Sequence, residues 1–127
     1  MMRHDELRPG DERRSARGTY ALVFRDDGEV VVVGPDGSVV WAMGTAGRGA
    51  ATLRVRDDGD LVAETAGGEE VWAAREHGGE LAATPGGCTL VVHDDGEVVV
   101  RDGGGKVLWS TWAGPQTFTS FAVLLKT

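Results

Sequence analysis

The stretch that decides the fold is Leu22-Val-Phe-Arg-Asp-Asp-Gly-Glu-Val-Val-Val-Val33. It recurs as Leu53-Arg-Val-Arg-Asp-Asp-Gly-Asp-Leu-Val-Ala-Glu64 and as Leu90-Val-Val-His-Asp-Asp-Gly-Glu-Val-Val-Val-Arg101. A tryptophan follows each copy at the same offset of 14 residues, from Asp27 to Trp41, from Asp58 to Trp72 and from Asp95 to Trp109. Because a fixed internal period is the signature of a repeat architecture, these copies predict three equivalent β units in one domain.

Each repeat is predicted to contain three short antiparallel strands. In the first repeat they span residues 20–25, 29–33 and 38–42, separated by two glycine-containing turns. Valine-rich runs favour a pleated, half-buried surface, and glycine supplies the positive φ that such turns require. The second repeat spans 51–74 and the third spans 88–111, and the extra residues between them fall in a predicted surface loop over 75–87. No window has apolar residues at helical spacing, so no helix is expected.

The three repeated tryptophans are predicted to lie inside the protein. They end the third strand of each repeat, so three equivalent indoles can meet at a shared axis and fill it. The alternative is a platform on which sugars stack. Trp112 lies outside the repeat pattern, and we expect it to contact either the terminal strand or a ligand.

Composition excludes several classes of protein. A chain of 127 residues is one domain, and its net charge of -7 argues against a nucleic-acid-binding surface. The segment 1–18 is a basic polar arm, which we interpret as either disordered or a first strand. Cys88, the single cysteine, cannot form an intramolecular disulfide and is expected to be a small buried residue at the start of a strand.

The expected location is cytoplasmic, because no apolar leader follows Met1 and no apolar run is long enough for membrane insertion. Release without a leader is the alternative. The richness in Gly, Ala, Val, Arg and Asp resembles a GC-rich bacterial genome.

The repeats resemble those of the bulb-type, monocot mannose-binding lectins, the B-lectin family. That family has a β-prism II fold and carries the motif Gln-x-Asp-x-Asn-x-Val-x-Tyr once per repeat, followed by a turn and a core tryptophan. The resemblance covers about residues 19–113. It implies an all-β prism of three antiparallel sheets related by pseudo-three-fold symmetry, with a mannose-type or other carbohydrate as ligand.

The resemblance also implies a homodimer. Residues 114–127 contain an apolar predicted strand, 117–125, with no partner inside its own repeat. An exposed apolar strand is a pairing hazard, so it must be covered or exchanged. The lectin family exchanges its terminal strand between two chains, and we expect the same here.

Carried onto this chain, the motif is degenerate in every repeat. The Asp position holds Asp27, Asp58 and Asp95, and the Val position holds Val31, Val62 and Val99. The Gln position holds Arg25, Arg56 and His93, the Asn position holds Glu29, Asp60 and Glu97, and the Tyr position holds Val33, Glu64 and Arg101. These fifteen residues are the candidate sugar-binding positions.

Three interpretations of the replaced residues stay open. Arg25–Glu29, Arg56–Asp60 and His93–Glu97 can pair across each hairpin and close the old pocket, although exposed pairs stabilise by only about 0–1 kcal/mol. Alternatively, each repeat keeps an altered polar site for another sugar, or residual mannose binding survives. If all sugar binding is lost, the chain is an interaction or structural domain on a lectin scaffold.

No other chemistry is predicted. The Asp doublets suggest calcium, but turns that use Asp for backbone hydrogen bonding explain them more simply, so we predict no metal and no cofactor. The histidines fit no nucleophile or zinc motif, and the acids Glu29, Asp60 and Glu97 lie one per repeat. The protein is therefore not expected to be an enzyme.

Overall fold

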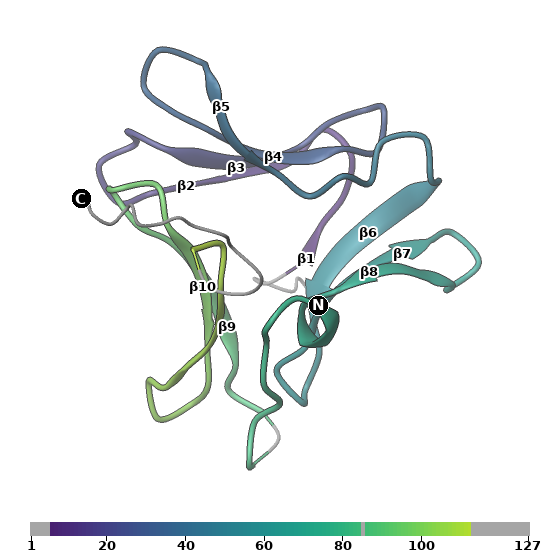
Figure 1. The fold of residues 1–127 in the computed structure, drawn as a ribbon, viewed down its shortest axis with the longest axis vertical. Helices are drawn as coiled ribbons and strands as arrows, with labels where there is room; N and C mark the ends of the chain where they lie inside the picture. Colours follow the sequence, from purple (N-terminus) through teal and green to yellow (C-terminus); the bar gives the residue numbers. More distant parts are fainter. Residues whose placement is uncertain (1–5, 85, 113–127) are drawn as a thin grey trace.

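The computed structural model describes residues 6–84 and 86–112. Three antiparallel sheets form the sides of a triangular prism around one axis, and each sheet contains the three strands of one repeat (Figure 1). Within the described residues the only helical element is a single 3₁₀ turn, η1 (Ala74–Glu76). The all-β, three-sheet β-prism II prediction is confirmed.

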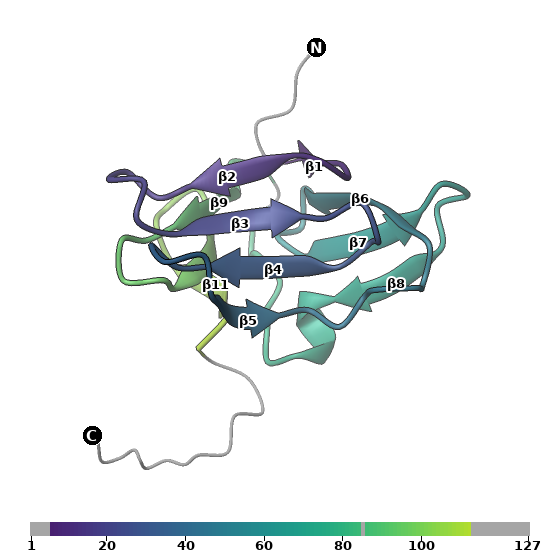
Figure 2. The ribbon, with the colours of Figure 1, turned by 90° about the horizontal axis from the view of Figure 1, so that it is seen from above.

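The strands follow the predicted order within each repeat. Sheet 1 is ordered β2-β3-β4-β5, shown face-on in Figure 2, with bounds Glu12–Arg14, Ala21–Phe24, Val30–Val33 and Val39–Ala42. Sheet 2 is ordered β1-β6-β7-β8, with bounds Glu6–Leu7, Ala50–Val55, Leu61–Thr65 and Glu70–Ala73. Sheet 3 is ordered β11-β10-β9, with β9 at Thr89–Val92, β10 at Val98–Arg101 and β11 at Val107–Ser110.

The amino-terminal arm supplies strands to two different sheets. Strand β1 pairs with β6, the first repeat strand of sheet 2, and β2 pairs with β3, the first repeat strand of sheet 1. Sheet 3 has three strands where the others have four, and among the described residues no strand occupies the corresponding place beside β9. The predicted terminal strand, 117–125, lies outside the described residues.

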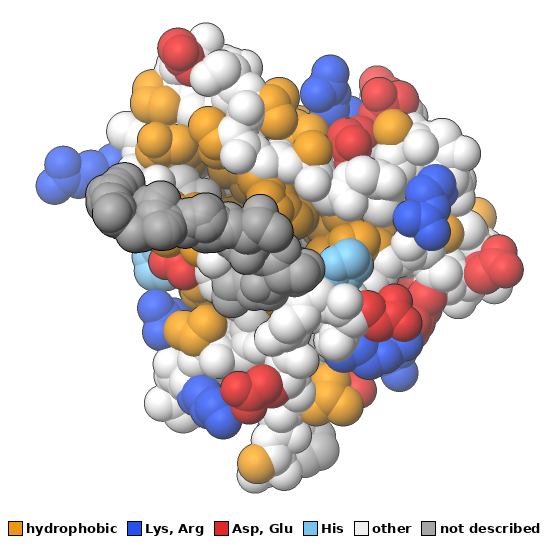
Figure 3. Space-filling view, viewed as in Figure 1, with side chains coloured by type: hydrophobic (Ala, Val, Ile, Leu, Met, Phe, Trp, Pro, Cys, Tyr) orange, Lys and Arg blue, Asp and Glu red, His pale blue; other side chains and the backbone are white. Residues whose placement is uncertain are grey.

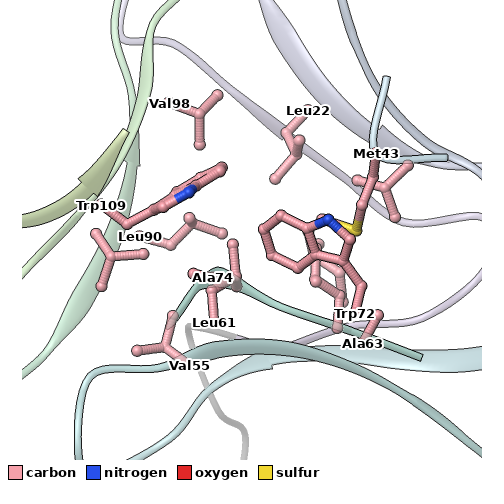
Figure 4. Close-up of a cluster of buried hydrophobic side chains, with 14 of the residues drawn as sticks. Leu22, Met43, Val55, Leu61, Ala63, Trp72, Ala74, Leu90, Val98 and Trp109 are labelled. Carbon is pink, nitrogen blue, oxygen red and sulfur yellow. The ribbon is translucent and has the colours of Figure 1, made fainter. Parts of the chain in front are cut away.

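The three repeated tryptophans meet at the prism axis, as predicted, although only Trp72 and Trp109 are buried and Trp41 is partly exposed. The ring centroids of Trp41, Trp72 and Trp109 lie 5.4 to 6.3 Å apart, all in edge-to-face geometry. Aliphatic side chains from all three sheets pack around Trp72 and Trp109 (Figure 4). The His77 ring stacks on Trp72 with centroids 4.8 Å apart, and its carbonyl accepts a 3.2 Å hydrogen bond from Trp109 Nε1. The long connection after β8 thus covers the tryptophan cluster.

The Asp-Asp-Gly turns interlock neighbouring repeats. Each turn glycine has a positive φ, +89° at Gly28, +86° at Gly59 and +95° at Gly96. A Cβ at Gly96 would lie 2.9 Å from the Tyr20 ring of the first repeat, and one at Gly59 would overlap Leu108 of the third. These positions therefore need glycine twice over, for backbone conformation and for close approach.

The connection 75–87, predicted to be a surface loop, is attached to the sheets by backbone hydrogen bonds. Ala82 N and Gly86 N donate to the carbonyls of Asp58 and Asp57 in the second repeat's turn, at 2.7 and 2.9 Å. Glu80 N donates to Leu108 O in β11. Cys88, expected to be buried, is only half-buried, because it ends this connection just before β9 instead of lying inside a strand.

Candidate functional site

The fifteen motif positions fall into three equivalent sets on the outer faces of the sheets. We name them site 1 (Arg25, Asp27, Glu29, Val31, Val33), site 2 (Arg56, Asp58, Asp60, Val62, Glu64) and site 3 (His93, Asp95, Glu97, Val99, Arg101). Side chains alternate across a strand, so the positions next to the core-facing Val30, Val32, Val98 and Val100 face outward. The three motif valines are nonetheless at most 2% exposed, because neighbouring side chains cover them.

The retained aspartates hold their own turns. Oδ1 of Asp27, Asp58 and Asp95 accepts the backbone N–H two residues later at 2.9, 3.0 and 3.0 Å. This Asx-turn bond is the role that Asp commonly plays in turns. It occupies one carboxylate oxygen in every site, and it agrees with the turn interpretation of the Asp doublets.

The predicted ion pairs across the hairpins are wrong. Arg25, Arg56 and His93 donate their backbone N–H to the carbonyls of Glu29, Asp60 and Glu97 at 2.8 to 2.9 Å, but no ion pair joins their side chains. Glu29 and Asp60 instead reach the segment that follows the tryptophan strand, and Glu97 reaches Ser110 at the end of that strand. A backbone N–H or hydroxyl there offers an acid fixed geometry, whereas an Arg across an exposed hairpin must give up side-chain entropy for a screened pair.

In site 1 the acid is used by the fold. Glu29 Oε1 accepts the backbone N–H groups of Gly44 and Thr45 at 2.8 and 2.9 Å. The Arg25 side chain is exposed, and no described acid pairs with it. The Tyr position holds the half-buried Val33, next to Val39 and Val40, which are 49% and 54% exposed. Figure 3 shows hydrophobic side chains at the surface over this sheet, at the top of the view. The Tyr position of site 1 is therefore apolar, whereas its arginine is exposed.

Site 2 is closed by charges from outside the motif. Asp60, 2% exposed, accepts both the backbone N–H of Arg75, at 3.0 Å, and its guanidinium. Arg75 also donates to Glu70 at 2.6 Å, and Glu70 pairs with Arg56 at 2.9 Å. The hydrogen bond from Arg75 holds the pKa of Glu70 below its usual range. Bonds to Glu70 and Asp60 raise the pKa of Arg75 above its usual value.

The acid at the Tyr position of site 2 is ion-paired as well. Glu64 accepts two hydrogen bonds from Arg54, at 3.0 and 3.4 Å, and this contact raises the pKa of the Arg54 guanidinium. The connection 75–87 covers the turn through its bonds to Asp57 and Asp58. Basic and acidic side chains lie next to one another on this side of the molecule (Figure 3). In site 2, the charged side chains at the Gln, Asn and Tyr positions are therefore all ion-paired, and Asp58 holds its own turn.

Site 3 keeps polar groups without a closing ion pair. His93 Nε2 lies 3.4 Å from Arg101 Nη2, and no described acid forms an ion pair with either side chain. Glu97 Oε2 accepts the hydroxyl of Ser110 at 2.6 Å, and Ser110 Oγ accepts the backbone N–H of Trp112 at 3.0 Å. The Trp112 side chain is 54% exposed.

The neighbouring acid at site 3 is committed elsewhere. The backbone N–H of Arg17 donates to Asp94 Oδ1 at 2.9 Å and holds the pKa of Asp94 below its usual range. Arg17 Nε also lies 3.9 Å from Asp94 Oδ2. The amino-terminal arm thus supplies the partner of the acid beside His93.

The partners of the motif acids were not found from the sequence. Arg75 lies 15 residues after Asp60, just as Gly44 lies 15 residues after Glu29. That common offset is the signal that could have revealed them. Ser110 lies 13 residues after Glu97 and breaks the pattern, so only the fold reveals it.

Other kinds of site find little support in the described part of the chain. No three His, Cys, Asp or Glu side chains there gather to hold a metal ion. A hollow of about 380 Å³ is lined by residues of the loops 83–86 and 102–104, none of them a motif residue. No helix among the described residues is long and apolar enough to cross a membrane.

The three sheets, the axial tryptophans and the outward motif positions define a β-prism II protein of the lectin type. No family model and no curated protein matches the chain. Solved structures do match. A Marasmius oreades lectin is 26% identical, covers 84% of each chain and has a TM-score of 0.69. A monomeric monocot mannose-binding lectin from Gastrodia elata is 26% identical over 87% of this chain and 98% of that one, with a TM-score of 0.64.

A Polygonatum cyrtonema lectin, solved in complex with monomannoside, is 27% identical over 88% of this chain and 94% of that one, with a TM-score of 0.61. These matches confirm the resemblance of this chain to the bulb-type monocot mannose-binding lectins.

Proposed function

We propose that the protein is a lectin-like, non-catalytic carbohydrate-binding module with degenerate mannose-type sites, and that site 3 is the site in use. The supporting observation is that site 3 alone keeps two half-buried nitrogen-bearing side chains, His93 and Arg101, free of an ion pair. The arginine of site 2 is ion-paired to Glu70, and the arginine of site 1 is exposed. Asp95 and Glu97 each have one carboxylate oxygen left to accept from sugar hydroxyls.

The exposed Trp112 supports this choice of site. The Trp112 backbone N–H donates to Ser110, and Ser110 donates to Glu97. The Cα of Trp112 therefore lies next to site 3. Aromatic rings combine a large apolar face with few rotatable bonds and are suited to packing against a ligand. Trp112→Ala should therefore weaken sugar binding while leaving stability nearly unchanged.

The proposal is tested in two ways, by titrating the full chain with methyl mannoside and by screening it on a glycan array. Binding that disappears in Asp95→Ala, but persists in Asp27→Ala of site 1, supports it. The two substitutions remove the same turn bond in equivalent hairpins, so they are matched for their effect on folding.

The second candidate function is an interaction or structural domain that has lost sugar binding. It is favoured by the acids at the Asn positions of sites 1 and 2, since Glu29 and Asp60 are used by the fold. A folded protein that binds no sugar on the array would support this candidate and exclude the first.

We also propose that the chain is a homodimer in which residues 117–125 of each copy pair with β9 of the other. The support is that, among the described residues, sheet 3 has three strands and sheets 1 and 2 have four. Light scattering on the full chain should give twice the monomer mass of 13.4 kDa. Phe121→Asp should yield the monomer mass, whereas Gln116→Asp, outside the predicted strand, should not. A monomeric wild-type chain would contradict the proposal.

A further inference from the structure

Sites 1, 2 and 3 present three different charge patterns at equivalent positions. At the Gln and Tyr positions, site 1 has an arginine and a valine, site 2 has an arginine and a glutamate that are both ion-paired, and site 3 has His93 and Arg101. Only in site 3 do two nitrogen-bearing side chains meet on the outer face of one sheet.

Arg101 reaches His93 along the strand. In sheet 3, Arg101 lies opposite Thr89, whereas His93 lies beyond Val92 at the hairpin end of β9. The contact of 3.4 Å between Nη2 and Nε2 therefore requires the Arg101 side chain to extend over Val99, the motif valine of the same face. Val99 is 1% exposed, and Arg101 itself is half-buried. The Arg101 guanidinium also donates to Gly105 O at 3.1 Å, which helps to fix its position.

The guanidinium at this position has donors left for a ligand. It carries five N–H groups in a planar fork, of which one contacts Gly105 O and one points toward His93. No described acid forms an ion pair with it. The acids around it are committed in part, Asp94 to Arg17, Asp95 to its own turn and Glu97 to Ser110. Arg101 is thus a positioned, unneutralised cation beside sugar-type acceptors.

We infer that site 3 takes an acidic sugar, a hexuronate whose carboxylate is bound by Arg101 with His93 beside it. The inference rests on the proposed function and names its substrate class. A guanidinium binds a carboxylate through parallel, charge-assisted hydrogen bonds, which a neutral hydroxymethyl group cannot replace. Asp95 and Glu97 accept from the ring hydroxyls, so the site offers cationic donors for the carboxylate and anionic acceptors for the hydroxyls.

The test compares two ligands that differ in one group, methyl mannoside and methyl mannosiduronate, by isothermal titration of the full chain. We expect the uronate to bind about tenfold more tightly in wild type, the difference that one charge-assisted hydrogen-bonding contact makes. Arg101→Gln should remove that preference. Arg25→Gln removes an equal charge from site 1 and should leave it intact. Thermal melts establish that each variant is folded.

The possible failures are distinguishable. Equal affinity for the two ligands in wild type overturns this inference and leaves the proposed function standing. A preference lost in Arg25→Gln but kept in Arg101→Gln also overturns it, because the cation would then lie in site 1. Competition by sodium acetate as strong as by the uronate shows a general anion site and overturns it. No binding of either ligand by folded protein overturns the proposed function and this inference together.

The double variant His93→Gln/Arg101→Tyr provides an independent test of the preference for the uronate. It installs the lectin-family residues at the Gln and Tyr positions of site 3. If the cationic pair determines the choice of sugar, this variant should bind methyl mannoside at least as tightly as the uronate. A retained preference for the uronate would contradict the inference.

Discussion

The interlocking of the repeats can be measured with two alanines in one repeat. Gly96 and Gly105 have nearly the same backbone conformation, with φ of +95° and +93°. A Cβ at Gly96 would lie 2.9, 3.0 and 3.3 Å from three carbons of the Tyr20 ring, whereas one at Gly105 meets nothing within 4 Å. Each alanine adds the left-handed backbone cost of about 1–2 kcal/mol. Gly96→Ala should add overpacking of about 1–3 kcal/mol.

Urea denaturation followed by tryptophan fluorescence gives the free energy of unfolding of each variant. We expect Gly105→Ala to lose about 1–2 kcal/mol and Gly96→Ala about 2–5 kcal/mol, with unchanged m-values. Tyr20→Ala removes the ring that the new Cβ would meet. Combined with Gly96→Ala, it should recover part of the additional loss in the free energy of unfolding, because the two side chains then no longer collide. Equal losses in the two glycine variants, or strict additivity with Tyr20→Ala, would refute the docking of this turn on the first repeat.

Three further predictions follow from the contacts described above. Trp109→Ala should destabilise the protein by about 3–5 kcal/mol, because it opens the axial cluster and removes the hydrogen bond to the His77 carbonyl. Thermal or urea unfolding measures this loss, and a value below about 1 kcal/mol would contradict an axial role. Glu29→Ala should lower the free energy of unfolding by about 1–3 kcal/mol, because it leaves the backbone donors of Gly44 and Thr45 unpaired. Glu29→Gln keeps an acceptor oxygen and should cost less. Equal losses in the two variants would argue against those hydrogen bonds. Arg75→Gln should raise the pKa of Glu70, measured by NMR titration, toward its usual value near 4.5. Because the folded pKa of Glu70 is depressed, its stabilisation is present above pH 4.5 and is lost as pH falls through the lowered value, so wild type and Arg75→Gln should converge in stability in acid.

The sequence was sufficient for the architecture because the signals of the fold are local and occur three times. Valine runs set strands, Asp-Asp-Gly sets hairpins, and the constant offset to the tryptophans places one large indole at the same point of each repeat. Three such units can bury their apolar faces only against one another, so the axial cluster of Trp41, Trp72 and Trp109 was predictable. The short N-terminal strands β1 and β2 were harder to predict, since each pairs with a sheet that the other does not join.

The sites show where sequence alone stopped. It located all fifteen motif positions, and it showed that the amides and the phenol of the family had been replaced. It did not show what replaced their interactions, because the partners of Glu29 and Asp60 lie one turn beyond the next two strands. A charged side chain chooses its partner by three-dimensional distance and desolvation, and both depend on how the sheets close into a prism. The sequence by itself determined a three-repeat lectin scaffold with altered sites. Only the tertiary structure decided that site 2 is closed by Arg75, that site 1 gives its acid to the fold, and that Arg101 meets His93 in site 3.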